Sequence, residues 1–207
     1  MKTNEFTQLK EQERDVRRNL IMDAAERVFA AKSFDKVNMR EIAKEAGISP
    51  GTIYTYFPDQ ETLFVEASAR GAEELIRRIS VIASQENRSL EEAAEIYIDF
   101  FMDHHEYLRM MQHCMLYGKF SAEDSLERLL QAYRRLFDQF DLILQDSNIA
   151  IPKEILRLDT HIFFSFVNGV LFSFGRAPRR SEDEIRSHMK HLIKRLTAIF
   201  INRIPGQ

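Results

Sequence analysis

The chain has 207 residues, and 44% of them are hydrophobic, which is enough apolar material to bury a substantial core. It carries 29 Lys and Arg against 32 Asp and Glu, a formal net charge of −3, so no overall basic surplus indicates a nucleic-acid partner. Cys114 is the single cysteine. An intrachain disulfide is therefore excluded, and we expect a reducing, cytoplasmic environment.

The N-terminal region is charged through Arg18 and lacks the apolar core of a signal peptide, so we expect no export signal. The longest stretch without Asp, Glu, Lys or Arg runs from Thr160 to Gly175. It is shorter than the ~20 apolar residues that a membrane-spanning helix needs. We therefore expect no membrane partner and interpret this stretch as a buried or intersubunit helix.

Seven glycines and five prolines are too few for the many turns of a β domain, so the sequence predicts an all-α protein. A first helix is indicated by a core-facing stripe of Leu20, Ile21, Ala24, Ala25, Val28 and Phe29. Further helix starts are indicated where a serine precedes an acidic residue by three positions: Ser89 and Glu92, Ser121 and Asp124, Ser181 and Glu184. The C-terminal part is predicted to hold five or six helices.

The most informative segment runs from Asn38 to Phe57. Asn38 can cap a short helix, Gly47 can end it in a left-handed conformation, and Ser49 followed by Pro50 can start a second helix. Two short helices joined by a tight glycine turn form a helix-turn-helix. An ordinary helical hairpin would show the same spacing.

Hydroxyl-bearing side chains on the second helix favour DNA binding over that alternative. Ser49, Thr52, Tyr54 and Thr55 suit phosphate oxygens and base edges. An exposed tyrosine at position 54 is costly on a purely structural helix.

Between Arg17 and Ala67, the sequence AAERVFAAKSFDKVNMREIAKEAGISPGTIYTYF and the Leu63-Phe64 pair that follows resemble the DNA-binding domain of the TetR family of transcriptional regulators. The resemblance implies a three-helix DNA-binding domain at 15–62 and a larger helical effector-binding and dimerisation domain at 63–207. It also implies a repressor that a small effector releases from a palindromic operator.

Position by position, the resemblance makes Ser49–Tyr56 the recognition helix. It implies base-facing roles for Arg40, Pro50, Gly51 and Thr55, and phosphate contacts for Thr52, Tyr54 and Tyr56. Arg17 and Arg18 could add charge toward the DNA backbone. One departure is Gln60, which stands where the family usually has a phosphate-binding lysine; glutamine can still donate a hydrogen bond but releases no counterion.

The charge is unevenly distributed along the chain. Residues 1–57 carry ten Lys and Arg against nine Asp and Glu, whereas the remainder carries 19 against 23. We therefore expect operator affinity to come from a few positioned contacts and from two DNA-binding heads per molecule.

A homodimer is expected, because one helix-turn-helix offers little interface for reading two half-sites. By resemblance, the segments Ile155–Phe174 and Glu184–Asn202 form an intersubunit four-helix bundle. The alternative is a core helix of a monomer. The predicted interface residues are Phe163, Val167, Val170, Phe174, Met189, Leu192 and Leu196.

A stretch from Phe100 to Phe120 is rich in Met, Phe and His. Such residues at helical spacing can be ordinary core, or they can line a pocket for a small hydrophobic or aromatic effector. The predicted pocket residues are Phe101, His105, Met111, Cys114, Tyr117, Phe163 and Phe166.

We expect neither a metal site nor a cofactor. His105 and His113 share a helix face, but no Cys-x-x-Cys or His-x-x-x-His pair accompanies them. The chain also lacks Gly-x-Gly-x-x-Gly and phosphate-binding Gly-Lys loops, so an enzyme is not expected. The main rival to a regulator is a helical interaction module or small-ligand carrier, which would not bind a palindromic duplex specifically.

Overall fold

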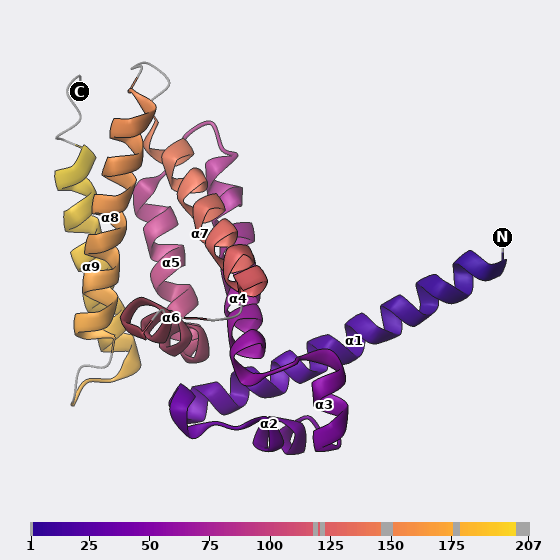
Figure 1. The fold of residues 1–207 in the computed structure, drawn as a ribbon. Coiled ribbons are helices and arrows are strands. Elements are labelled where there is room, and N and C mark those ends of the chain that lie inside the picture. Colours follow the sequence, from indigo (N-terminus) through magenta and orange to yellow (C-terminus); the bar gives the residue numbers. More distant parts are fainter. Residues whose placement is uncertain (1, 118–119, 121–122, 146–150, 176–178, 202–207) are drawn as a thin grey trace. The chain divides into compact units, whose positions relative to one another are not determined.

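The computed structural model describes residues 2–117, 120, 123–145, 151–175 and 179–201 (Figure 1). Within these ranges every regular element is helical, so the all-α prediction is confirmed. The elements are α1 (Lys2–Ala31), the 3-10 turn η1 (Phe34–Lys36), α2 (Met39–Glu45), α3 (Pro50–Tyr56), α4 (Gln60–Ala83), α5 (Leu90–Asp103), α6 (His105–Tyr117), α7 (Glu123–Leu144), α8 (Lys153–Phe174) and α9 (Glu182–Ile201).

Contacts within the chain define two compact units. The first contains the chain up to Gly71 together with His105–Leu129, and the second contains Ala72–His104 together with the chain from Leu130 onward. The boundary therefore lies inside α4, whereas the sequence suggested one after residue 62. Helix α6 belongs to the first unit, a grouping that needs tertiary contacts and leaves no mark in the sequence.

The first unit is built around the C-terminal half of α1, which packs against α2 and α6. The predicted stripe of α1 is buried from Ile21 to Phe29, but Leu20 is exposed. At 100° per residue Leu20 lies at the edge of that stripe, which explains the difference. The core also includes Ile42, Ile53, Phe57, Leu63 and Phe64.

A polar cluster joins α1, α4 and α6 inside this unit. Glu26 accepts hydrogen bonds from the Tyr107 hydroxyl at 2.7 Å and from Arg70 Nε at 3.0 Å. Burial raises the pKa of Glu26, and its two donors act in the opposite direction. Gly71 lies so close to the Tyr107 ring that an added Cβ would be 2.5 Å from Cδ1, which explains a glycine within α4.

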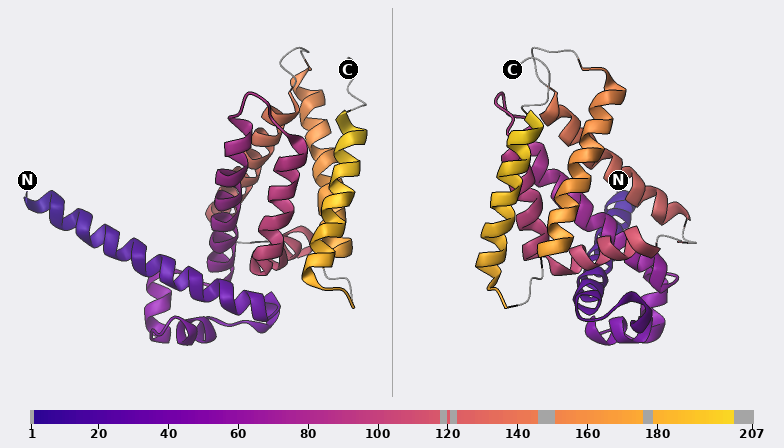
Figure 2. Two further views of the ribbon diagram at one scale, coloured as in Figure 1. Left: turned by 180° about the vertical axis from the view of Figure 1, so that it is seen from behind. Right: turned by 90° about the vertical axis from the view of Figure 1, so that its left-hand side faces the viewer.

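The second unit contains α5, α8 and α9 packed side by side (Figure 2). Its core is aromatic: the Phe164 ring contacts the rings of Tyr97, Phe137 and Phe140. The Tyr97 hydroxyl donates a 2.7 Å hydrogen bond to Asn168 Oδ1, so its polar end is satisfied inside the unit. Ion pairs of Arg186 with Asp99 and Asp103 connect α9 to α5.

Helix caps follow the predicted pattern at two positions. The Ser89 hydroxyl accepts from the backbone N–H of Glu92, and Ser181 and Glu184 exchange side-chain to backbone hydrogen bonds. The predicted cap at Ser121 lies outside the described residues. Helix α8 is, by length and composition, the one described helix that could cross a membrane, but core helices of soluble proteins meet the same criteria.

Candidate nucleic-acid interface

The helix-turn-helix forms as the residues predict. Asn38 Oδ1 accepts from the backbone N–H of Glu41 at 3.0 Å and caps α2. Gly47 has a φ of +69°, and the Ile48 N–H then bonds to the Ala43 carbonyl at 2.9 Å, which closes the turn. The Ser49 hydroxyl accepts from the Thr52 N–H at 3.1 Å and starts α3.

Helix α3 has one buried face and one open face. Ile53 on the helix and Phe57, the residue directly after its C-terminal end, are fully buried and hold the helix in place. Tyr54 is 53% exposed, which is unusual for a large aromatic residue and leaves its ring available to a partner. The other predicted contact residues comprise four exposed ones, Ser49, Pro50, Gly51 and Thr55, and two half-buried ones, Thr52 and Tyr56. Arg40, on α2, is exposed.

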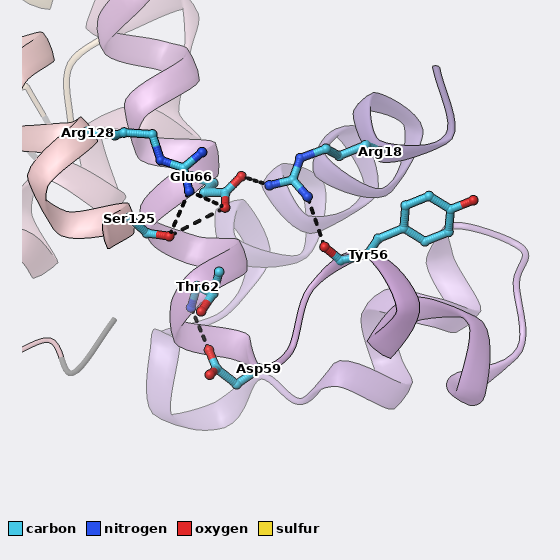
Figure 3. Close-up of polar contacts among 7 residues, drawn as sticks. All are labelled: Arg18, Tyr56, Asp59, Thr62, Glu66, Ser125 and Arg128. Atoms are coloured by element: carbon cyan, nitrogen blue, oxygen red, sulfur yellow. Dashed lines mark hydrogen bonds and ion pairs between the residues drawn. The ribbon is translucent and has the colours of Figure 1, made fainter. Parts of the chain in front are cut away.

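The C-terminal end of α3 is held from α1 (Figure 3). Arg18 Nη1 donates to the Tyr56 carbonyl at 2.9 Å, and the guanidinium lies 4.3 Å from the centroid of the Phe57 ring. Burial lowers the pKa of Arg18. The expectation that Arg18 contacts the DNA backbone is therefore replaced by an internal, positioning role.

Glu66 on α4 is the partner that fixes Arg18. Its carboxylate forms ion pairs with Arg18 and, at 3.1 Å, with Arg128, and the Ser125 hydroxyl lies 3.4 Å from it (Figure 3). Near the start of the same helix, Asp59 accepts from the Thr62 N–H at 2.7 Å. The cluster links α1, α3, α4 and the first turns of α7, all within the first unit. Sequence reasoning missed it because the residues are far apart along the chain.

Gln60 does not present its amide outward as expected. Its Nε2 donates a 2.8 Å hydrogen bond to the Phe34 carbonyl of η1 and ties that turn to α4. The carbonyl needs a donor near the surface, and the first turn of α4 supplies it. A phosphate contact from Gln60 is therefore not supported.

The predicted effector residues are divided between the two units. The stretch from Phe100 to Phe120 breaks at His104, so Phe101 lies in the second unit while His105, Met111 and Cys114 lie in the first. Phe101 and Phe163 are buried in the second unit. The side chain of Tyr117 is outside the described residues.

Phe166 is 56% exposed and cannot line an interior pocket beside Phe163. Phe163 stands at the edge of the buried face of α8, and Phe166 lies about 60° further around the helix, outside that face. The structure thus corrects the predicted pocket at this residue.

The predicted dimer residues also separate by burial. Phe163, Val167 and Met189 are almost fully buried within the protomer, so they offer no surface to a partner. Val170, Phe174, Leu192 and Leu196 are half-buried. The exposed apolar residues of α8 form a different stripe: Ile155, Leu158, Ile162, Phe166 and Phe172.

This stripe could have been read from the sequence. Successive members of Ile155, Leu158, Ile162 and Phe166 are three or four residues apart, and at 100° per residue they lie roughly opposite the buried face. The periodicity shows two apolar faces on α8, but it does not say which one faces the protomer core.

Comparisons with known proteins agree with this architecture. Residues 21–67 match the family described as bacterial regulatory proteins, tetR family. The chain is 26% identical over 165 residues to the HTH-type transcriptional regulator YfiR of Bacillus subtilis, covering 76% of this chain and 80% of YfiR. It is also 26% identical over 156 residues to the regulator PksA of the same organism, covering 71% and 76% of the two chains.

Solved structures share the fold. The regulator FadR from Bacillus subtilis, in complex with stearoyl-CoA, matches with a TM-score of 0.68 at 18% identity, over 89% of this chain and 98% of FadR. A tetR-family regulatory protein from Rhodococcus RHA1 matches with a TM-score of 0.68 at 20% identity, over 87% and 96% of the two chains.

The capped two-helix motif, its open hydroxyl-bearing face and the helical remainder define a helix-turn-helix transcriptional regulator that binds DNA, a class distinct from enzymes. Its DNA-binding region, residues 21–67, matches the tetR family of bacterial regulatory proteins.

Proposed function

We propose that the protein is a dimeric repressor that binds a palindromic operator through α3 and is released by a small hydrophobic effector. The observation that carries the proposal is the open face of α3, where Tyr54 is 53% exposed while Ile53 is fully buried. Side chains that reach base edges and phosphates must stand on a helix whose opposite face is anchored. Operator binding would place the protein in the cytoplasm.

The dimer is supported by the outer stripe of α8. Leu158 and Phe166 are each more than half exposed on the same face, and such a contiguous apolar face is costly to leave in water. Ile199 on α9 is also 54% exposed. We assign the interface to this stripe together with the half-buried Val170, Phe174, Leu192 and Leu196. They replace Phe163, Val167 and Met189, which are buried in the protomer core.

The effector is proposed to enter the aromatic cluster of the second unit. Phe101 contacts Tyr97, and Tyr97 contacts Phe164, so apolar rings surround one polar pair, Tyr97 and Asn168. An apolar ligand with one polar end suits this combination. The FadR structure contains stearoyl-CoA, which makes long-chain acyl compounds reasonable first probes.

Selection of bound duplexes from a random pool tests the DNA-binding part. The expected result is an enriched palindrome whose half-sites are separated by about one or more helical turns. Failure to enrich any sequence would contradict the proposal and favour a helical interaction module or ligand carrier.

Repeating the binding measurement with stearoyl-CoA and with free fatty acids tests the effector part. The ligand should weaken the affinity for the duplex by about 5- to 150-fold, which corresponds to a coupling free energy of about 1–3 kcal/mol between the effector site and the DNA-binding site. Phe101→Trp should remove this response in the second unit, and Val81→Trp at an exposed position of α4 serves as the control.

A further inference from the structure

The N-terminal part of α1 extends past α2 and α3 as a single helix (Figures 1 and 2). We call residues Lys2–Arg17 the α1 arm. Every side chain of the arm from Glu5 to Arg17 is exposed, so the arm buries none of them in its own protomer. A long helix with no packed face is stable only if it gains contacts elsewhere or is supported by its continuation into the core.

Charges on the arm are sorted by face. At 100° per residue, Lys10, Arg14 and Arg17 lie within an arc of about 60°. Two of the arm's acidic residues, Glu5 and Asp15, lie on the opposite half of the helix by the same reckoning, Glu11 lies at right angles to the cations, and Glu13 lies beside Arg17. The near-zero net charge of the arm therefore conceals one cationic side.

The cationic side faces the end of the recognition helix. Lys10, Arg14 and Arg17 line, with Glu13, an open groove of about 390 Å³ whose other wall is Thr55 and Tyr56 of α3. Arg17 contacts the Tyr56 side chain and Glu13, and both contacts raise its pKa above the ordinary value. The side chains of the Arg17–Glu13 ion pair are 59% and 61% exposed, so salt in solution weakens the pair.

We propose that the α1 arm is a second DNA-binding surface, on which Lys10, Arg14 and Arg17 contact phosphates next to the half-site read by α3. The inference rests on the proposed operator binding and adds a backbone contact outside the helix-turn-helix. It explains how a head with almost no net charge gains phosphate affinity although Gln60 and Arg18 are engaged internally.

Charge complementarity favours DNA, rather than a second copy of the chain, as the partner that binds in this groove. The groove is bounded by the C-terminal residues of the recognition helix, so a duplex docked on α3 passes beside it, and its lining carries three cations against one carboxylate. An apolar row of Phe6, Leu9 and Val16 lies on an adjacent face of the arm, and contact between arms of two copies is the alternative outcome of the test.

The test compares wild type with Lys10→Gln/Arg14→Gln on a duplex enriched by wild type from the random pool. The logarithm of the binding constant is measured against the logarithm of salt concentration. Each lost phosphate contact should reduce the slope by about 0.9, so the double variant should lose about 1.8 per bound protomer. The enriched sequence should be unchanged, because phosphate contacts carry no base information.

A matched control removes the same charge from the second unit. Arg77→Gln/Lys194→Gln alters two cations with side chains 74% and 71% exposed, and should keep the wild-type slope. Shortening the duplex at its flanks should lower the DNA affinity of wild type to nearly that of Lys10→Gln/Arg14→Gln. The affinity of the double variant itself should hardly change.

The outcomes separate the two proposals. A wild type that enriches a palindrome while the arm variant keeps its slope overturns the arm contact alone. A wild type that enriches nothing overturns both. If Lys10→Gln/Arg14→Gln changes the molecular mass measured by sedimentation and leaves the salt slope unchanged, the arm contacts a second copy of the chain. This result too overturns the inference.

Discussion

The Arg18 guanidinium donates a 2.9 Å hydrogen bond to the backbone carbonyl of Tyr56, the last residue of the recognition helix. A cation at a helix C-terminus also complements the helix dipole. Glu66 and the Phe57 ring hold the guanidinium from its other sides. The end of α3 is thereby fixed to α1 by a residue that need not touch DNA.

Arg18→Gln should lower the free energy of unfolding by about 1–3 kcal/mol, because a part-buried carbonyl and Glu66 lose their charged donor. Operator affinity should fall, but the salt slope should stay at the wild-type value, since no phosphate contact is removed. Chemical denaturation and binding titrations check both results. Arg27→Gln, which breaks an exposed pair with Glu45, is the control and should stay within about 0.5 kcal/mol. A reduced salt slope in Arg18→Gln would contradict the positioning role.

Tyr54→Ala should weaken specific binding by roughly 5- to 150-fold, the equivalent of about 1–3 kcal/mol for one lost contact. Tyr54 is more than half exposed, so the free energy of unfolding should change little. Fluorescence anisotropy with the enriched duplex measures the affinity, and Val81→Ala, at a similarly exposed position, is the control. Unchanged specific binding would show that α3 is not the reading helix.

The outer face of α8 predicts a charge-sensitive dimer. Phe166→Glu should raise the dimer dissociation constant at least about 100-fold, because an unpaired carboxylate buried in an interface costs roughly 3–5 kcal/mol. Sedimentation equilibrium measures this directly. As the control, Leu142→Glu places the same charge on α7, where Leu142 is 45% exposed. This variant should leave the dimer intact. A dimer that tolerates Phe166→Glu would place the interface elsewhere.

Cys114 should react slowly with alkylating reagents. Burial raises the pKa of its thiol to about 11, so at pH 8 it should react roughly 200-fold more slowly than a free thiol with a pKa near 8.5. The rate should rise about tenfold per pH unit until the pH approaches 11, because only the thiolate reacts. Mass spectrometry of iodoacetamide adducts follows the reaction.

A thiol moved by one residue provides the control for this measurement. Cys114→Ser/Met115→Cys places it at a position where the native side chain is 55% exposed, and this variant should react at an ordinary rate. Equal rates for the two proteins at pH 8 would contradict the burial of Cys114.

Local chemistry was sufficient to predict the DNA-binding motif. Asn38, Gly47 and Ser49 act on backbone groups within five residues of themselves, and the structure shows each in its expected role. The same is true of the capping serines at 89 and 181. Such interactions depend on sequence spacing alone, which is why the helix boundaries of the motif could be read without coordinates.

The roles of Arg18, Gln60 and Phe166 depended instead on distant partners. The sequence shows that Arg18 and Gln60 are polar and that Phe166 is apolar, but the partners of the first two are Tyr56, Glu66 and Phe34. Whether an apolar residue of α8 faces inward is likewise set by which side α5 and α9 cover. The sequence by itself determined the helices, their caps and the family motif, because hydrogen bonds between near neighbours follow from spacing. Only the tertiary structure decided which cations are exposed and can contact DNA, and which apolar face of α8 is left for a partner. The reason is that packing buries some side chains and leaves others of the same chemistry exposed.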